Sequence, residues 1–141
     1  MIPSTVQEQK KEAFRLFEDG RYQESLNLCM LVLAAEKDQP VEVLAATNLF
    51  YTGRLEDAQV HFRDLALKMP DSSYVHSYLG KVLEDGGDEG AIAEYATAVH
   101  LDPTNQDALR SYAEYPLRGK TTGGQSRSLN VSLHWAGMNA I

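Results

Sequence analysis

The side chains best suited to catalysis or metal binding are scattered along this chain. The four histidines, His61, His76, His100 and His134, include no pair at the four-residue spacing that places two ligands together on one helix. His100 and Asp102 come nearest to a ligand pair, but they fall at the end of a predicted helix, where a capping or surface role is typical. We therefore expect no metal site.

Cys29 is the only cysteine, which excludes an intrachain disulfide and a cysteine-based zinc site. It aligns with Phe62 and Tyr95 in a repeat described below, so we expect a small core residue rather than a nucleophile. The glycine-rich run 86–90 lacks the Lys-Ser/Thr pair of a phosphate loop and predicts a turn. Without a catalytic constellation or a cofactor motif, we expect a protein that is not an enzyme and needs no cofactor.

The charge is acidic and unevenly distributed. The net charge is −7, and residues 1–115 hold all 20 acidic side chains against 10 Lys and Arg, whereas the last 26 residues carry three basic side chains and no acidic one. Binding to phosphates needs a basic surface, so nucleic acid is not the expected partner. No apolar run approaches the length of a membrane span, and no signal peptide precedes the first helix, so we expect a soluble cytoplasmic protein.

Three glycine turns recur at a nearly constant interval, which predicts an internal repeat. Gly20 and Gly53 are 33 residues apart, and Gly53 and Gly87 are 34 apart. A small residue lies seven positions before each glycine and a leucine four before it, and another small residue and then a larger one follow the turn. In chain order these sets are Ala13, Ala46 and Gly80; Leu16, Leu49 and Leu83; Ser25, Ala58 and Ala91; and Cys29, Phe62 and Tyr95.

Apolar residues on both sides of each turn recur at three- and four-residue spacing, as in the segment 46–50. This period predicts an amphipathic helix before and after each glycine. Glycine suits the end of a helix, where a left-handed backbone conformation is needed. Asp71 or Ser72, and Thr104 with Asp107, are the expected N-caps of later helices.

These units resemble the tetratricopeptide repeat, whose 34-residue pattern is W-x₂-L-G-x₂-Y, then A-x₃-F, then P. The first unit is the most degenerate, with Lys37 where proline is expected, and the third has His76 at the Trp position. The best matches are Leu79-Gly80-x₂-Leu83, Ala91-x₃-Tyr95 and Pro103 in the third unit, and Ala46-x₂-Leu49, Ala58-x₃-Phe62 and Pro70 in the second.

The resemblance covers residues 5–115 and implies an all-α fold, a short right-handed α-solenoid of three helix pairs. The repeats are expected at about 6–38, 39–72 and 73–105. A capping helix at 104–115 would cover the apolar face that a terminal repeat leaves, and Pro116 is expected to end it.

The resemblance also implies that the first helix of each pair lines a concave surface. In the second unit this helix is apolar almost all round, unlike an exposed helix, and its counterparts are rich in aromatic residues. We predict that these side chains form a groove that binds a peptide or helix, with the two lysines orienting it. The alternative is that they are core residues or are covered by the C-terminal tail. The predicted set is Lys10, Phe14, Phe17, Val43, Leu44, Thr47, Phe50, Tyr51, Tyr74, Tyr78 and Lys81.

Binding of chaperone C-termini, an activity of the tetratricopeptide-repeat family, is not expected here. The family's clamps for chaperone C-termini hold a carboxylate through Lys, Asn and Arg side chains of three successive repeats. Lys10 fits that pattern, whereas the other places hold Phe14, Leu44, Tyr74 and Tyr78. We therefore favour a non-enzymatic adaptor for a protein or peptide partner. Two alternatives stay open: a small chaperone that shields an apolar client segment in secretion or complex assembly, and a structural protein that assembles through its solenoid ends.

The last 26 residues differ from the repeats in composition. Residues 116–128 are rich in Gly, Ser and Thr, as in a flexible linker, and residues 129–135 alternate apolar and polar, as in a strand with one buried face. Three interpretations stay open for this tail. It is disordered, it docks in extended form on its own or a neighbouring repeat, or it pairs with a partner's strand edge. Docking on a neighbour would give a homo-oligomer.

Overall fold

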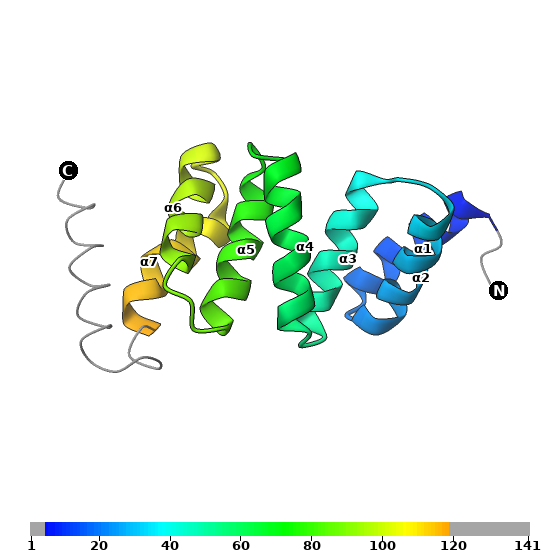
Figure 1. The fold of residues 1–141 in the computed structure, drawn as a ribbon, viewed down its shortest axis with the longest axis horizontal. Helices are drawn as coiled ribbons and strands as arrows, with labels where there is room; N and C mark the ends of the chain where they lie inside the picture. Colours follow the sequence, from blue (N-terminus) through cyan, green and yellow to red (C-terminus); the bar gives the residue numbers. More distant parts are fainter. Residues whose placement is uncertain (1–4, 119–141) are drawn as a thin grey trace. The chain divides into compact units, whose positions relative to one another are not determined.

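The computed structural model describes residues 5–118, and within that range the chain forms seven α-helices and no strand (Figure 1). The predicted all-α fold class is therefore confirmed. The helices are α1 (Val6–Glu18), α2 (Tyr22–Ala35), α3 (Gln39–Tyr51), α4 (Leu55–Lys68), α5 (Ser73–Asp85), α6 (Ala91–Leu101) and α7 (Gln106–Arg118).

The helices belong to two compact units, Met1–Lys68 with α1–α4 and Met69–Ile141 with α5–α7. In the first unit α2 packs against α1 and α3, α4 packs against α3, and α1 also touches α3. In the second unit α6 packs against α5 and α7, and α5 also touches α7. Within each unit, contacts thus join helices that are close in sequence, as in repeat proteins.

The repeated leucine and glycine positions form the motif that ends the first helix of each pair. Gly20, Gly53 and Gly87 have φ angles of 80°, 86° and 76°, the left-handed conformation that the sequence predicted. The amide after each glycine donates to the carbonyl of the leucine four positions before that glycine, at 2.9, 2.9 and 2.8 Å. This is the hydrogen bond that closes a Schellman turn, so the constant spacing has a backbone cause.

Side-chain caps set where several helices begin. Thr5 accepts from the amide of Glu8 and the Glu8 carboxylate accepts from the amide of Thr5, which makes a capping box for α1. Ser72 caps α5 by accepting from the Val75 amide, which confirms one of the two predicted residues.

The predicted cap of the last helix was wrong by one residue. Asn105, rather than Thr104, accepts from the Ala108 amide, at 3.1 Å. The reason is local competition, because the Thr104 hydroxyl and amide both donate to the carboxylate of Asp102. At its other end α7 runs to Arg118, three residues beyond Tyr115, where we expected it to stop. Proline removes one backbone hydrogen bond but holds φ near the helical value, so Pro116 fits the last turn.

The repeated small residues lie where the helices of a pair cross. A Cβ atom on Gly80 would stand 2.6 Å from Cε1 of Tyr95, so the Tyr95 ring packs directly on the α5 backbone. The Tyr95 hydroxyl donates to the Glu84 carboxylate at 2.7 Å, which holds the ring in place. Equivalent positions in the other repeats pair Ala46 with Phe62 and Ala13 with Cys29, all of them buried.

A buried chain of hydrogen bonds ties α1, α2 and α3 together. The Ser25 hydroxyl donates to the carbonyl of Ala13 at 2.7 Å, and the side-chain amide of Asn48 donates to the Ser25 oxygen at 2.8 Å. Polar groups with partners inside a core fix its arrangement more strictly than apolar packing does, because leaving them unpaired is costly. These bonds hold the first unit's helices in one register.

Candidate functional site: aromatic surfaces of the first helices

Aromatic rings of three helices meet in the first unit, in what we call the aromatic cluster. Tyr22 of α2 stacks on Tyr51 of α3, with ring centroids 4.7 Å apart, and meets the edge of Phe17 of α1 at 5.5 Å. Phe50 lies 5.1 Å from Tyr51. Such ring pairs contribute about 0.5–1.5 kcal/mol beyond their buried area. The cluster therefore supports a rigid surface at the ends of α1 and α3.

The cluster brings together three of the predicted site residues, Phe17, Phe50 and Tyr51. It also includes Tyr22, which the sequence analysis did not select because it belongs to the second helix of its pair. The position of Tyr22 two residues after Gly20 could have indicated this contact, because the turn at Gly20 brings the chain back to the end of α1.

The other predicted residues of the first unit differ in exposure. Phe14 of α1 is 40% exposed and Val43 of α3 is half-buried, whereas Leu44 and Thr47 are buried. The Thr47 hydroxyl donates to the carbonyl of Val43, within the same helix. Leu44 and Thr47 thus act through packing of α3, and the most exposed of the predicted residues in this unit are Phe14 and Tyr51, the latter also 40% exposed.

In the second unit, the predicted residues of α5 form a smaller patch that reaches α7. The rings of Tyr74 and Tyr78 lie 4.7 Å apart, and the ammonium group of Lys81 sits 4.6 Å from the centre of the Tyr78 ring. This is the geometry of a cation–π contact. Lys81 also forms an ion pair with Asp107 of α7. Tyr78 is buried beneath these groups, and Tyr74 is 42% exposed, so Tyr74 is the accessible ring.

Both predicted lysines are held by acidic side chains. Lys10 lies 2.6 Å from Asp38 and 2.7 Å from Glu36 in the segment that leads into α3. Hydrogen bonding to Asp38 is the main cause that raises the pKa of Lys10, and the same bond lowers the pKa of Asp38. Asp38 also caps α3 by accepting from the Val41 amide. A carboxylate of a partner would have to compete with two carboxylates for Lys10.

Cys29 is a core residue, as expected from its alignment in the repeat. Its side chain is buried, and burial raises the pKa of the thiol to about 11. The thiolate is the nucleophilic form, so this cysteine is unreactive at neutral pH.

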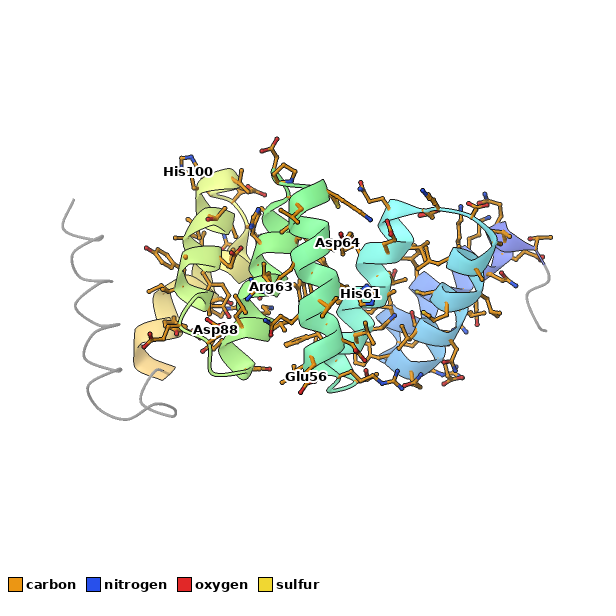
Figure 2. The ribbon with its side chains drawn as sticks, viewed as in Figure 1. Glu56, His61, Arg63, Asp64, Asp88 and His100 are labelled. Atoms are coloured by element: carbon orange, nitrogen blue, oxygen red, sulfur yellow. The ribbon has the colours of Figure 1, made fainter. Side chains whose placement is uncertain are left out.

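The histidines within the described range belong to separate helices. His76 of α5 links its pair, with Nδ1 2.8 Å from a Glu94 oxygen of α6 and Nε2 2.9 Å from the carbonyl of Pro70. Figure 2 shows His61 on α4 and His100 at the end of α6. Across residues 5–118, no group of three His, Cys, Asp or Glu side chains could hold a metal ion. His134 and the whole predicted docking segment 129–135 lie outside the described residues.

The same part of the chain contains no helix with the length and apolar character that a membrane crossing requires.

Solved structures of other proteins share this fold at low sequence identity. The first TPR of Spaghetti (RPAP3), bound to the HSP90 peptide SRMEEVD, superposes with a TM-score of 0.69 and 16% identity, covering 81% of this chain and 92% of that chain. PcrH in complex with the chaperone binding region of PopB gives 0.68 and 15%, covering 80% and 96%. MamA gives 0.71 and 14%, covering 98% and 82%.

Comparisons with protein-family models and with curated proteins gave no match. The structural likeness is nevertheless extensive, because it covers four-fifths or more of each chain compared. This chain therefore has the tetratricopeptide-repeat fold, as its repeated residues predicted.

Proposed function

We propose that this protein is a non-enzymatic adaptor that binds a peptide or helix of a partner protein. The binding surfaces are the aromatic patches on the first helix of each pair, α1 and α3 in the first unit and α5 in the second. The observation that carries the proposal is that three large rings, Phe14, Tyr51 and Tyr74, remain about two-fifths exposed on these helices. Aromatic side chains are enriched at protein interfaces because they bury a large area at little entropic cost.

The solved structures with this fold support a peptide-binding role. The first TPR of RPAP3 was solved with a peptide of HSP90, and PcrH with a region of PopB. The fold thus accommodates peptide ligands in proteins of comparable length, and the exposed rings supply the apolar contacts that such a ligand needs.

The chemistry of the surfaces favours an apolar ligand over a terminal carboxylate. Lys10 already pairs with Asp38 and Glu36, and Lys81 with Asp107, so neither lysine offers an uncompensated charge. The net charge of −7 disfavours nucleic acid. The single buried thiol fits a reducing compartment, and we place the protein in the cytoplasm.

A chaperone for an apolar client segment is the second candidate. It is favoured by the likeness to PcrH, whose complex contains the chaperone binding region of PopB. Co-expression distinguishes the two candidates. An adaptor should be stable and monodisperse without its partner, whereas a dedicated chaperone should raise the yield of soluble client when the two are expressed together. Assembly with further copies through helix-pair ends would appear instead as concentration-dependent mass in light scattering.

The test is an affinity pull-down with mass spectrometry, comparing wild type with the double variant Phe14→Ala and Tyr74→Ala. Both rings lie at the surface, about two-fifths exposed, so we expect unchanged helix content and a melting temperature close to wild type, with loss of the specific partner. Leu67→Ala is the matched control, because Leu67 is 83% exposed but lies on α4, a second helix. Equal recovery of the same partners by all three proteins would contradict the proposal.

A further inference from the structure

A groove opens in the first unit between α2 and α4. These helices do not pack against each other; α3 contacts both and lies between them in Figure 1. The groove has a volume of about 730 Å³, and Ala45 and Leu49 of α3 line its floor. We call it the α2–α4 groove. It does not include any of the residues assigned to the aromatic surfaces.

One wall of the groove is apolar because α2 carries two apolar stripes. Its core stripe, with Cys29 and Val32, packs inside the unit. A second stripe lines the groove at the four- and three-residue spacing of one helix face, with Leu26 buried at its base, Met30 exposed and Leu33 half-buried. Met30 is 60% exposed. An apolar stripe beyond the one that the core uses is typical of a helix that meets a partner.

The opposite wall, on α4, is polar and mostly acidic, with one basic side chain, Arg54, at its end. Asp57, His61 and Asp64 line it at the same spacing as the α2 stripe, and Figure 2 shows His61 and Asp64 on this helix. Within residues 5–118, the Asp57 carboxylate makes no hydrogen bond or ion pair, whereas Lys68 bonds Asp64 at 3.0 Å and lies 3.6 Å from Glu42. The groove thus has a largely apolar wall on α2 and a mostly acidic wall on α4, and the Asp57 carboxylate forms no ion pair there.

We propose that the α2–α4 groove binds an amphipathic α-helix of a partner protein, with leucine-like side chains against α2 and lysine or arginine side chains against α4. The side chains on both walls recur at four- and three-residue spacing. This spacing matches that of the anchor residues on a helix that lies along the groove. The floor and walls are helices whose backbone groups are bonded within the helices, so an extended peptide would find no backbone partners and only a few polar side chains such as Gln23 and Asn27. A helix satisfies its own backbone and needs only side-chain contacts.

The experiment measures binding of a fluorescein-labelled synthetic helix to the full chain by anisotropy. The probe is built from leucine, alanine and lysine, with leucines at four- and three-residue spacing and lysines along one flank. A peptide of the same composition in scrambled order controls for attraction between a basic peptide and an acidic protein. We expect binding of the patterned helix, and weakening of about tenfold or more by Met30→Glu, because a central apolar anchor is replaced by a charge.

Leu31→Glu is the matched control, since it adds the same charge on the same helix at a residue that is 54% exposed but does not line the groove. It should leave the affinity unchanged. Asp57→Lys should weaken the lysine helix and strengthen a helix in which glutamates replace the lysines. This reversal cannot come from unfolding, because an unfolded groove binds neither probe.

Four results would overturn the proposal. Equal effects of Met30→Glu and Leu31→Glu would remove the groove from the binding site. Loss of binding in Phe14→Ala would place the helix on the aromatic surface instead. A shift in Trp135 emission when the probe binds would assign the groove to the chain's own C-terminal segment. A fall in molecular mass on binding would assign it to a second copy.

Discussion

Residue size at one helix crossing shows how this fold depends on single side chains. Gly80 and Tyr95 are the smallest and the largest residues that the three repeats place at this crossing, and each accommodates the other. The ring has no room to retreat, because Tyr95 is buried and its hydroxyl is bonded to Glu84. The glycine is therefore required by a close approach between helices rather than by backbone conformation.

Gly80→Ala is expected to destabilise the chain. Alanine favours a helix by about 1 kcal/mol over glycine, but its Cβ would lie 2.6 Å from a buried ring, and overpacking of this kind costs about 1–3 kcal/mol. The free energy of unfolding, measured by urea denaturation, should fall.

Gly86→Ala is the control for this substitution. A Cβ at Gly86 meets the carbonyl oxygens of Val82 and Leu83 at 3.5 and 3.6 Å, which is ordinary contact. This variant should be as stable as wild type. If Gly80→Ala were as stable as Gly86→Ala, the inferred close approach between α5 and α6 would be contradicted.

At the scale of helices, the features that the sequence predicted correctly are those with local causes. The leucine–glycine spacing is a backbone hydrogen-bond motif within six residues, so it marks the end of the first helix in every repeat. The alignment of Ala13, Ala46 and Gly80 identified the buried crossings, because a repeat preserves the positions where its helices meet.

The features that the sequence did not predict depend on contacts between distant residues. The partners of Lys10 are Glu36 and Asp38, which lie across the turn between α2 and α3. The apolar residues of α2 look equivalent in the sequence, and only packing against α1 and α3 decides that Leu26, Cys29 and Val32 are buried while Met30 is 60% exposed. The same holds for α5, where periodicity grouped Tyr74 with Tyr78 but the position of α7 determines that only Tyr74 is accessible.

The register of the first three helices is expected to depend on Ser25. Ser25→Ala removes the donor to the Ala13 carbonyl and the acceptor for the Asn48 amide, which then keeps only a 3.9 Å bond to the Cys29 sulfur. Leaving buried groups unpaired costs about 1–3 kcal/mol each, and the free energy of unfolding should fall by an amount in that range or above it.

Ser77→Ala is the matched comparison for Ser25→Ala. Ser77 is also a buried helical serine, but its hydroxyl oxygen has no hydrogen-bond partner within the described residues. Its removal should leave the melting temperature unchanged or raise it. Equal destabilisation by the two substitutions would show that the bonds of Ser25 contribute nothing beyond filling space.

For the whole molecule, charge is the property that selects among partners before contact. The net charge is −7, and several basic side chains are already paired with neighbours on the same helix, as Arg15 is with Glu12 and Asp19. An excess of one sign attracts partners of the other sign over distances longer than a hydrogen bond. Basic helices thus encounter this protein more often than acidic ones, whichever surface they finally occupy.

The binding of the lysine-helix probe has two contributions, long-range attraction between charges and direct side-chain contacts. Measured association and dissociation rates should separate them. Screening shortens the reach of charge from about 8 Å at 0.15 M salt to about 3 Å at 1 M. Added salt should therefore slow association markedly and change dissociation little, whereas Met30→Glu should act mainly on dissociation, because it removes a contact. Stopped-flow measurement across a salt series gives both rates. If salt instead accelerated dissociation and left association unchanged, the acidic surface would act only through direct ion pairs such as one to Asp57, and the field of the whole molecule would have no part in partner choice.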